Sequence, residues 1–198
     1  MNYIDWIELE EKVKKKQDAE RFHHTQGVMY TAAALAMVYG IDIERAKLAG
    51  LLHDCAKSSI PNSKKAEACD SYGIKISEFE RNNPHLLHGK LGAYFAKHKY
   101  GVKDDEICSA IAYHTTGKPD MTLLEQIIFI ADYIEPDRDE MPRLPEVRKA
   151  AFTDIDMCTE MIMYDTLEHL KESGRPIDTE TNEAFEYYHN LICERQKA

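Results

Sequence analysis

The sequence of 198 residues lacks any long apolar run, and no stretch approaches the about 18 to 20 apolar residues that a membrane-spanning helix needs. The first residues, 1–5, also lack a basic segment followed by an apolar one, which is the pattern of a secretory signal. We therefore expect a cytoplasmic protein that has no membrane partner.

Cysteine is sparse and unpaired in the sequence. No Cys-x-x-Cys motif occurs, and the residues are odd in number and widely spaced: Cys55, Cys69, Cys108, Cys158 and Cys193. This pattern predicts neither a disulfide framework nor a zinc–thiolate site. We expect ordinary thiols, some of them buried.

Positive charge is also in short supply, since the 25 Lys and Arg residues face 35 Asp and Glu residues and the formal net charge is −10. A nucleic-acid backbone requires a basic face, so we expect no nucleic-acid partner. Any polyanionic substrate must then be met by local cations, which means metal ions and a few well-placed Arg and Lys side chains.

Alternating apolar and polar runs long enough for a sheet are absent, and most of the chain shows helical periodicity, which predicts an all-α fold. Gly40 is a candidate C-cap, Asp42 a candidate N-cap, and Thr122 with Glu125 has the pattern of a capping box. The expected helices are at about 3–16, 18–39, 42–57, after 61, 84–101, 104–114, 122–136, 154–172 and 179–196.

The length fits a single domain, residues 1–198. The amphipathic helices in about 142–197 are expected to pack on the rest of the chain. A homodimer through these helices is compatible with the pattern but does not follow from it.

Two carboxylates occur where the helical pattern demands apolar residues. Asp54, with His53 before it, directly follows an apolar segment and is expected in the body of a helix, and Asp132 is the one polar residue within 127–134. An unpaired buried carboxylate costs several kcal/mol, so each must be neutral, paired or bound to a cation. For Asp132 alone, a salt bridge and a metal ion explain the position equally well.

Several histidines are placed to join these carboxylates. His24 shares an apolar stripe of its helix, whereas His23 falls on a more solvated face. His88 is followed one turn later by Gly92, which we interpret as room for an object near the ring, and His114 ends an apolar helix.

Other histidines carry weaker signals. His85 falls at a helix start, where a solvated or capping role is expected, and three more lie among charged or polar residues and are expected at the surface: His98, His169 and His189. One inward histidine is more often a satisfied core residue than a ligand. Four of them with two carboxylates instead indicate divalent first-row metal binding, with enough ligands for two ions that share a carboxylate.

The ordered series His24, His53-Asp54, His88, His114 and Asp132 resembles the ligand series of the HD-domain metal-dependent phosphohydrolase superfamily. The resemblance covers about 18–137 and includes the lysine three residues after the His-Asp pair, Lys57. Local segments such as 51–57, 84–89 and 131–138 resemble the YqeK branch of this superfamily. The similarity to that branch extends over nearly the whole chain. That branch comprises bacterial symmetrical dinucleoside-tetraphosphate hydrolases with a di-iron centre.

The resemblance implies a helical HD bundle with a dinuclear site. It implies that His24, His53 and Asp132 hold one ion, that His88 and His114 hold the second, and that Asp54 bridges them. Iron is the metal that it implies, although manganese, cobalt, nickel and zinc also suit these ligands. The expected reaction is cleavage of diadenosine tetraphosphate into two ADP molecules by a metal-activated hydroxide.

Four further residues are candidates for contacts with the substrate. Lys57 and Arg21 are expected to stabilise the charge on the phosphate, Lys57 as a catalytic cation, while Arg138 is a candidate for the distal phosphates and Thr115 for a hydrogen bond. For each cation, a simple solvated role is the alternative. Glu135, Asp137 and Asp139 are expected in a solvated acidic loop.

Other functions remain open at this point. A general nucleotide phosphohydrolase, acting on nucleoside mono-, di- or triphosphates, would use the same site. A non-catalytic nucleotide or alarmone sensor would bind without turnover, and a di-iron oxygenase would consume oxygen. A purely structural helical protein is the weakest alternative, because its core would carry costly polar groups.

Overall fold

The computed structural model describes residues 4–138, 141 and 143–197, and in these ranges the regular structure is entirely helical. The elements are α1 (Trp6–Lys14), α2 (Ala19–Tyr39), α3 (Ile43–Leu52), α4 (Asn62–Ser71), α5 (Glu78–Asn82), the 3-10 helix η1 (Pro84–Leu87), α6 (His88–His98), α7 (Asp105–Tyr113), α8 (Leu123–Ile134), α9 (Leu144–Ala151), α10 (Ile155–Glu172) and α11 (Thr179–Arg195). The expected all-α class is confirmed.

The predicted capping residues set the ends of the helices that carry the site. Gly40 adopts a left-handed conformation (φ +71°) and ends α2, and the Asp42 carboxylate accepts hydrogen bonds from the first turn of α3. Thr122 and Glu125 form the reciprocal hydrogen bonds of a capping box at the start of α8. The cap pattern in the sequence therefore predicted these boundaries correctly.

Three features differ from the prediction. Helix α3 ends at Leu52 rather than near Lys57, because the chain continues in tight turns with bonds such as Lys57 N–H to the Asp54 carbonyl (3.0 Å). The His-Asp pair therefore follows the helix instead of lying within it. The short helices α5 and α9 were not predicted, since helices of so few residues depend on tertiary packing.

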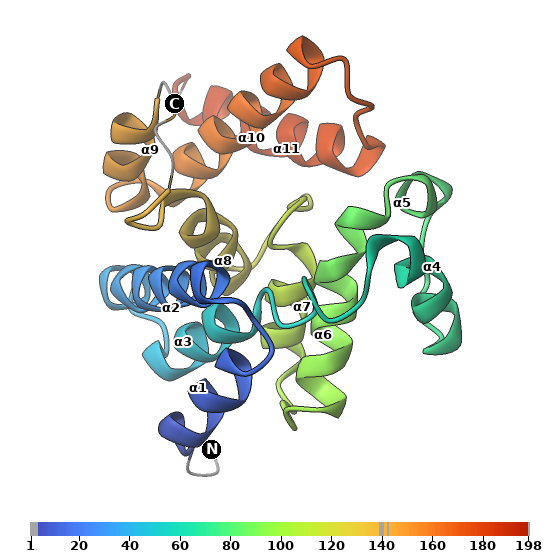
Figure 1. Cartoon of the computed structure of the whole chain (residues 1–198). Helices are drawn as coiled ribbons and strands as arrows, with labels where there is room; N and C mark the ends of the chain where they lie inside the picture. Colours follow the sequence, from blue (N-terminus) through green and yellow to red (C-terminus); the bar gives the residue numbers. More distant parts are fainter. Residues whose placement is uncertain (1–3, 139–140, 142, 198) are drawn as a thin grey trace.

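The helices that bear the candidate ligands pack directly on one another, with α2 against α3 and α8, and α7 against α6 and α8 (Figure 1). Two glycines allow the closest crossings. A Cβ at Gly50 would lie 2.8 Å from the Met29 Cα, and a Cβ at Gly89 would lie 2.5 Å from the Ala112 carbonyl oxygen. These contacts bring the backbones of α3 and α6 close enough for short side chains to meet between the helices.

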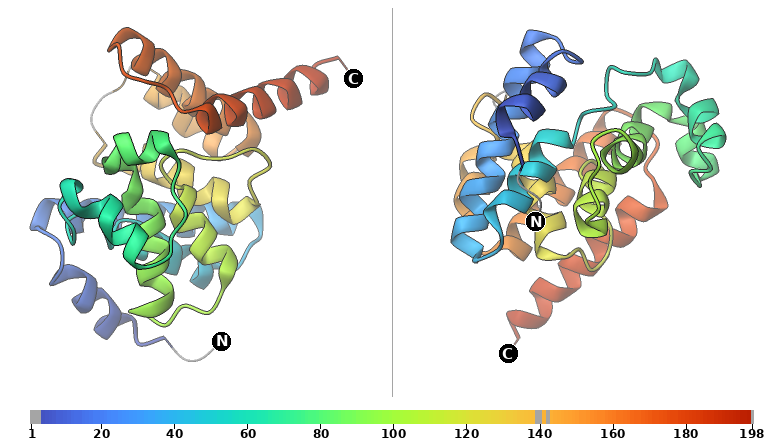
Figure 2. Two further views of the ribbon diagram at one scale, coloured as in Figure 1. Left: turned by 90° about the vertical axis from the view of Figure 1, so that its right-hand side faces the viewer. Right: turned by 90° about the horizontal axis from the view of Figure 1, so that it is seen from below.

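The C-terminal helices α9, α10 and α11 lie together on one side of this bundle, at the opposite end from α1 (Figures 1 and 2). Helix α10 packs on α8, and the Tyr188 hydroxyl of α11 accepts the Met121 N–H at 2.9 Å. One cluster of buried apolar side chains runs from Val13 to Tyr188. Within the described ranges, no helix is long and apolar enough to cross a membrane.

Candidate metal centre

Four imidazoles and two carboxylates converge at the centre of the bundle, although they come from five separate segments. They are His24 of α2, His53 and Asp54 after α3, His88 at the start of α6, His114 after α7 and Asp132 of α8. Two groups have ligand atoms within 4.8 Å of one another: His24, His53 and Asp132, and His53, Asp54 and His114. His88 joins the second group, since its Nε2 lies 3.3 Å from the Asp54 Oδ1.

The hydrogen bonds of three rings fix which nitrogen carries the proton. In His53, His88 and His114, Nδ1 lies 2.7, 2.6 and 2.7 Å from the backbone carbonyl three residues earlier. A carbonyl oxygen can only accept, so each Nδ1 donates and, in the neutral ring, each Nε2 is left with a bare lone pair. This is the tautomer and orientation found in metal-bound histidine.

Two of these bare nitrogens face each other, since Nε2 of His88 lies 3.1 Å from Nε2 of His114. The third, Nε2 of His53, lies 3.3 Å from Nε2 of His24. Two lone pairs at such distances repel unless a proton or a cation lies between them. The arrangement therefore fits a bound cation better than it fits a hydrogen-bonded core.

Asp54 lies at the middle of the cluster and is 1% exposed. Its Oδ1 has no hydrogen-bond partner among the described residues, whereas its Oδ2 accepts from Arg21 Nη1 at 3.0 Å. Burial raises the pKa of the carboxyl, but His53, His114 and Lys57 outweigh it and hold the pKa well below its usual range. A buried, ionised carboxylate with an unpartnered oxygen is suited to bridge two cations.

Asp132 and His24 form the other edge of the cluster. Asp132 Oδ1 lies 3.0 Å from His24 Nε2 and 3.8 Å from His53 Nε2. Burial raises the pKa of Asp132, but the bond to His24 and the charge of His53 outweigh it, so the pKa is lowered. His23 is 68% exposed and pairs with Asp137 at 2.8 Å. The choice of His24 over His23 as the inward histidine agrees with this geometry.

The structure corrects the interpretation of Glu135, which is not solvated but is only 2% exposed. Asp139, expected in the same loop, lies outside the described residues. Its Oε1 lies 3.2 Å from His24 Nδ1, and its Oε2 accepts the Asp137 N–H at 2.8 Å. Burial lowers the pKa of His24, while bonds to Asp132 and Glu135 raise it, with a net increase. Glu135 thus orients His24 as the backbone carbonyls orient the other rings.

Gly92 also has another role than the one expected. A Cβ at this position would lie 3.1 Å from Ile111 Cγ2 and 3.2 Å from the His53 carbonyl oxygen. The glycine therefore permits close packing of α6 on the turn after α3 and leaves no room for a ligand.

Of the candidates for substrate contacts, three reach the cluster. Arg21 donates to Asp54, Lys57 Nζ lies 3.1 Å from His88 Nε2 and 3.6 Å from Asp54 Oδ1, and Thr115 Oγ1 lies 3.1 Å from both His88 Nε2 and His114 Nε2. Arg138 follows Glu135, but within the described part of the chain no hydrogen bond or ion pair joins its guanidinium to the cluster. Two cations and a hydroxyl thus surround the carboxylate at the centre.

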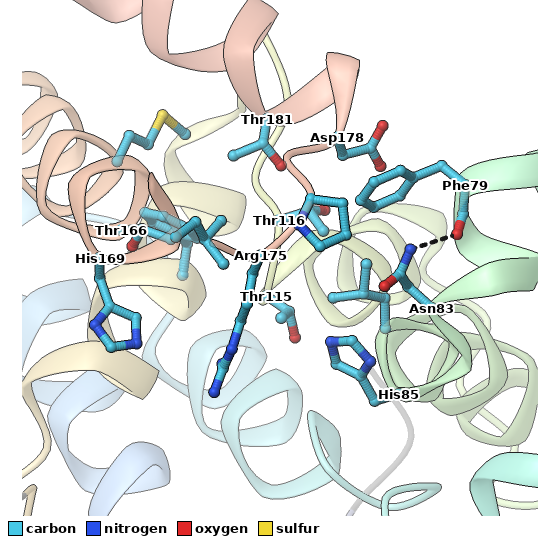
Figure 3. A pocket seen from close by; sticks show the side chains of 15 residues that line it. Phe79, Asn83, His85, Thr115, Thr116, Thr166, His169, Arg175, Asp178 and Thr181 are labelled. Carbon is cyan, nitrogen blue, oxygen red and sulfur yellow. Dashed lines mark hydrogen bonds between the residues drawn. The ribbon is translucent and has the colours of Figure 1, made fainter. Parts of the chain in front are cut away.

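A cavity of about 320 Å³ lies beside the cluster, with Thr115 in its wall (Figure 3). Its apolar surface includes Phe79, Leu86 and Phe129, and its polar surface includes His85 and Arg175. Since the Thr115 hydroxyl touches both His88 and His114, the cavity adjoins the side of the cluster where these rings lie. The sequence analysis missed this cavity, because its walls come from segments far apart in the chain.

His85 is exposed, as expected for a solvated histidine, and its ring also forms part of the cavity wall. Burial lowers the pKa of this ring, and the charges of Lys57, Arg175 and Lys65 lower it further. The positive charges of Lys57, Arg175 and Lys65 are therefore close enough to the His85 ring to affect its protonation.

Known proteins are similar to this chain in sequence and in fold. The HD domain model matches residues 21–137. The symmetrical bis(5'-nucleosyl)-tetraphosphatase of Halalkalibacterium halodurans is 36% identical over 184 residues, 93% of this chain and 95% of the relative. The enzyme of the same name from Bacillus subtilis is 38% identical over 169 residues, 85% of this chain and 89% of the relative.

A solved structure extends the similarity to the whole fold. The crystal structure of a protein of Clostridium acetobutylicum, described as a predicted HD superfamily hydrolase involved in NAD metabolism, superposes with a TM-score of 0.90. It is 38% identical in sequence, and the match covers 95% of this chain and 98% of the other. Membership of the family implies divalent metals, for which the cluster supplies a suitable donor set. The chain therefore belongs to the HD-domain family and, within it, to the group of the symmetrical bis(5'-nucleosyl)-tetraphosphatases.

Proposed function

We propose that this protein hydrolyses dinucleoside polyphosphates and cleaves diadenosine tetraphosphate symmetrically into two ADP molecules. The observation that supports the substrate most strongly is the similarity, along nearly the whole chain, to relatives that carry the name of this activity. The central cluster supports a hydrolytic reaction, because ionised carboxylates, imidazoles and two cations are the groups that phosphoanhydride cleavage requires.

The cluster would hold two divalent ions around Asp54. In this proposal His24, His53 and Asp132 ligate the first ion, His88 and His114 the second, and Asp54 both. Bound there, the metals supply Lewis acidity and a water molecule of lowered pKa. Iron is the metal that we propose, on the resemblance stated above, and the same donors accept manganese, cobalt, nickel or zinc.

The side chains around the metals determine where the phosphate chain lies. Arg21 and Lys57 contact Asp54 from the open side of the cluster, with side chains 33% and 36% exposed. Their charged groups are therefore available to donate to phosphate oxygens, on which negative charge increases during the reaction. The Thr115 hydroxyl, beside His88 and His114, supplies one further donor.

The reaction adds the oxygen of one water molecule to one of the two central phosphorus atoms. The bridging oxygen between these atoms leaves with the other half of the substrate, so both products are ADP, and two protons are released when the new terminal phosphates are fully ionised. The cavity beside the cluster has apolar walls suited to one adenosine, with Phe79, Leu86 and Phe129 against the base. Arg138 remains a proposed contact for the outer phosphates.

The test is a product assay with diadenosine tetraphosphate on purified protein reconstituted with iron under reducing conditions. We expect ADP as the sole product and a loss of activity of at least about 1000-fold in Asp54→Ala, since the central carboxylate is removed. A product mixture of AMP and ATP would overturn symmetrical cleavage.

Further outcomes separate the alternatives. Hydrolysis of simple nucleotides only would indicate a general nucleotide phosphohydrolase. Tight binding without any product would indicate a sensor, and oxygen consumption with a diol substrate would indicate an oxygenase.

A further inference from the structure

The loop between α10 and α11 carries an arginine that reaches into the cavity beside the metal cluster. Arg175 comes from outside residues 21–137, the part of the chain that matches the HD domain. Figure 3 shows its side chain extending between the rings of His85 and His169. The segment after α10 therefore contributes a cation to a site whose metal ligands all lie earlier in the sequence.

No carboxylate balances this cation. Within the described ranges, no acidic group lies within ion-pair distance of Arg175, although the cavity wall includes Asp178. The Asp178 carboxylate is engaged elsewhere, since it accepts the Glu180 N–H at the start of α11. A guanidinium that faces a cavity without an acidic partner is available to bind an anion from solution.

Other groups that can bind an anion lie in the same region. The His85 ring offers an N–H donor and lines the cavity together with Arg175, and the ammonium of Lys57 lies on the cluster side, 3.1 Å from His88 Nε2. Lys65 is only 2% exposed, and its ammonium donates to the Asn62 side-chain oxygen at 2.8 Å rather than to a carboxylate. In a protein with a net charge of −10, such a local excess of positive groups indicates an anionic ligand.

We propose that Arg175 and His85 form a phosphate-binding subsite in this cavity, separate from the metal cluster, which holds the phosphates next to the bound nucleoside. The inference rests on the proposed function, because the ligand is the part of a nucleotide substrate that is not cleaved. The metal cluster acts on the scissile phosphorus, and this subsite sets how far along the phosphate chain that phosphorus lies from the nucleoside. Lys65 makes no direct contact with the ligand in this proposal, because its ammonium is buried and bonded to Asn62, and it contributes only through its positive charge.

The proposal predicts that Arg175 recognises phosphate and not the nucleoside. Hydrogen bonds to charged groups contribute enough for removal of the guanidinium to weaken ADP binding by about 10- to 100-fold. In Arg175→Ala we therefore expect this loss for ADP, while adenosine binding changes by less than about twofold. His85→Ala should weaken ADP binding in the same selective way by about 3- to 10-fold, the effect of a neutral donor.

The experiment is isothermal titration of the metal-loaded protein with ADP and with adenosine, at low and at moderate salt. Lys171→Ala is the matched control, because this exposed lysine of α10 pairs with Glu168 and does not line the cavity. The control should bind both ligands as the wild type does. Arg175→Lys should recover part of the ADP affinity, because the charge is retained.

Several results would overturn the subsite. These are unchanged ADP binding in Arg175→Ala, an equal loss for ADP and adenosine, or absence of ADP binding to the wild type. The proposed function is judged separately, by whether diadenosine tetraphosphate is turned over. Tight ADP binding that depends on Arg175, without turnover of the dinucleotide, would support the subsite and refute the proposed reaction.

Discussion

Glu135 offers the sharpest test of how the cluster is organised, because it contacts the proposed ligand His24 and not the metal position itself. Its side chain is 3% exposed, and its Oε1 accepts from His24 Nδ1 at 3.2 Å. Removal of such a partner leaves the His24 ring free to rotate and makes its Nε2 a weaker ligand for a metal ion. Substitutions of this kind cost about 10- to 100-fold in metal affinity, which corresponds to about 1.4 to 2.8 kcal/mol.

We therefore expect Glu135→Ala to raise the free metal concentration at half-loading by about 10- to 100-fold for one of the two ions. The other ion should bind nearly as in the wild type, because His88 and His114 are oriented by backbone carbonyls. The assay is metal content by mass spectrometry after equilibration of metal-free protein with manganese buffered by a chelator. Two loading steps should separate in the variant.

Asp137→Ala is the matched control for this experiment. Asp137 lies two residues later in the same loop, but its carboxylate is 59% exposed and pairs with the exposed His23. Its substitution should leave both loading steps unchanged. An unshifted loading curve in Glu135→Ala, or the same shift in Asp137→Ala, would refute the role assigned to Glu135.

Gly27→Ala tests the same contact from the opposite side. A Cβ at Gly27 would lie 2.6 Å from Glu135 Oε2, so the carboxylate must move. Because alanine is favoured over glycine by about 1 kcal/mol in a helix, helix α2 itself gains stability from the change. A fall in metal affinity without loss of helix would therefore point to the displaced carboxylate.

Two further predictions concern the stability of the metal-free protein, measured by urea unfolding. Gly89→Ala should destabilise the protein by about 1 to 3 kcal/mol, because the new Cβ would lie 2.5 Å from the Ala112 carbonyl oxygen. A gain in stability, as expected at an open helix position, would contradict the close packing of α6 on α7. Burial and the charges of His114 and Lys57 hold the pKa of His88 well below 6.5. The free energy of unfolding is therefore highest above about pH 6.5 and decreases as the pH is lowered, because the unfolded chain takes up the proton at a higher pH than the folded one. The loss should reach at most about 1.4 kcal/mol per pH unit and should be smaller in His88→Gln, whereas parallel pH profiles of the two proteins would show that His88 does not cause it.

Much of the fold followed from local patterns, because helix starts and ends depend on a few neighbouring residues. Gly40, Asp42 and Thr122 lie where the cap patterns placed them. The helix that bears the His-Asp pair was predicted too long, since nothing local distinguishes a helix that continues to Lys57 from turns that follow Leu52. The short helices α5 and α9 were missed for the related reason that their stability comes from their neighbours.

The sequence by itself determined which six polar side chains are anomalous within or beside apolar segments and, through the family resemblance, how they are ordered. Which contacts they make was decided only by the tertiary structure. Glu135, which orients His24, lies 111 positions away, and the cavity brings His85 together with Arg175 of the loop between α10 and α11. Helical periodicity reports which face of one helix is buried, but not what other segments bring to that face. Contacts between distant segments depend on how the helices cross, and close approaches at Gly50 and Gly89 set those crossings here.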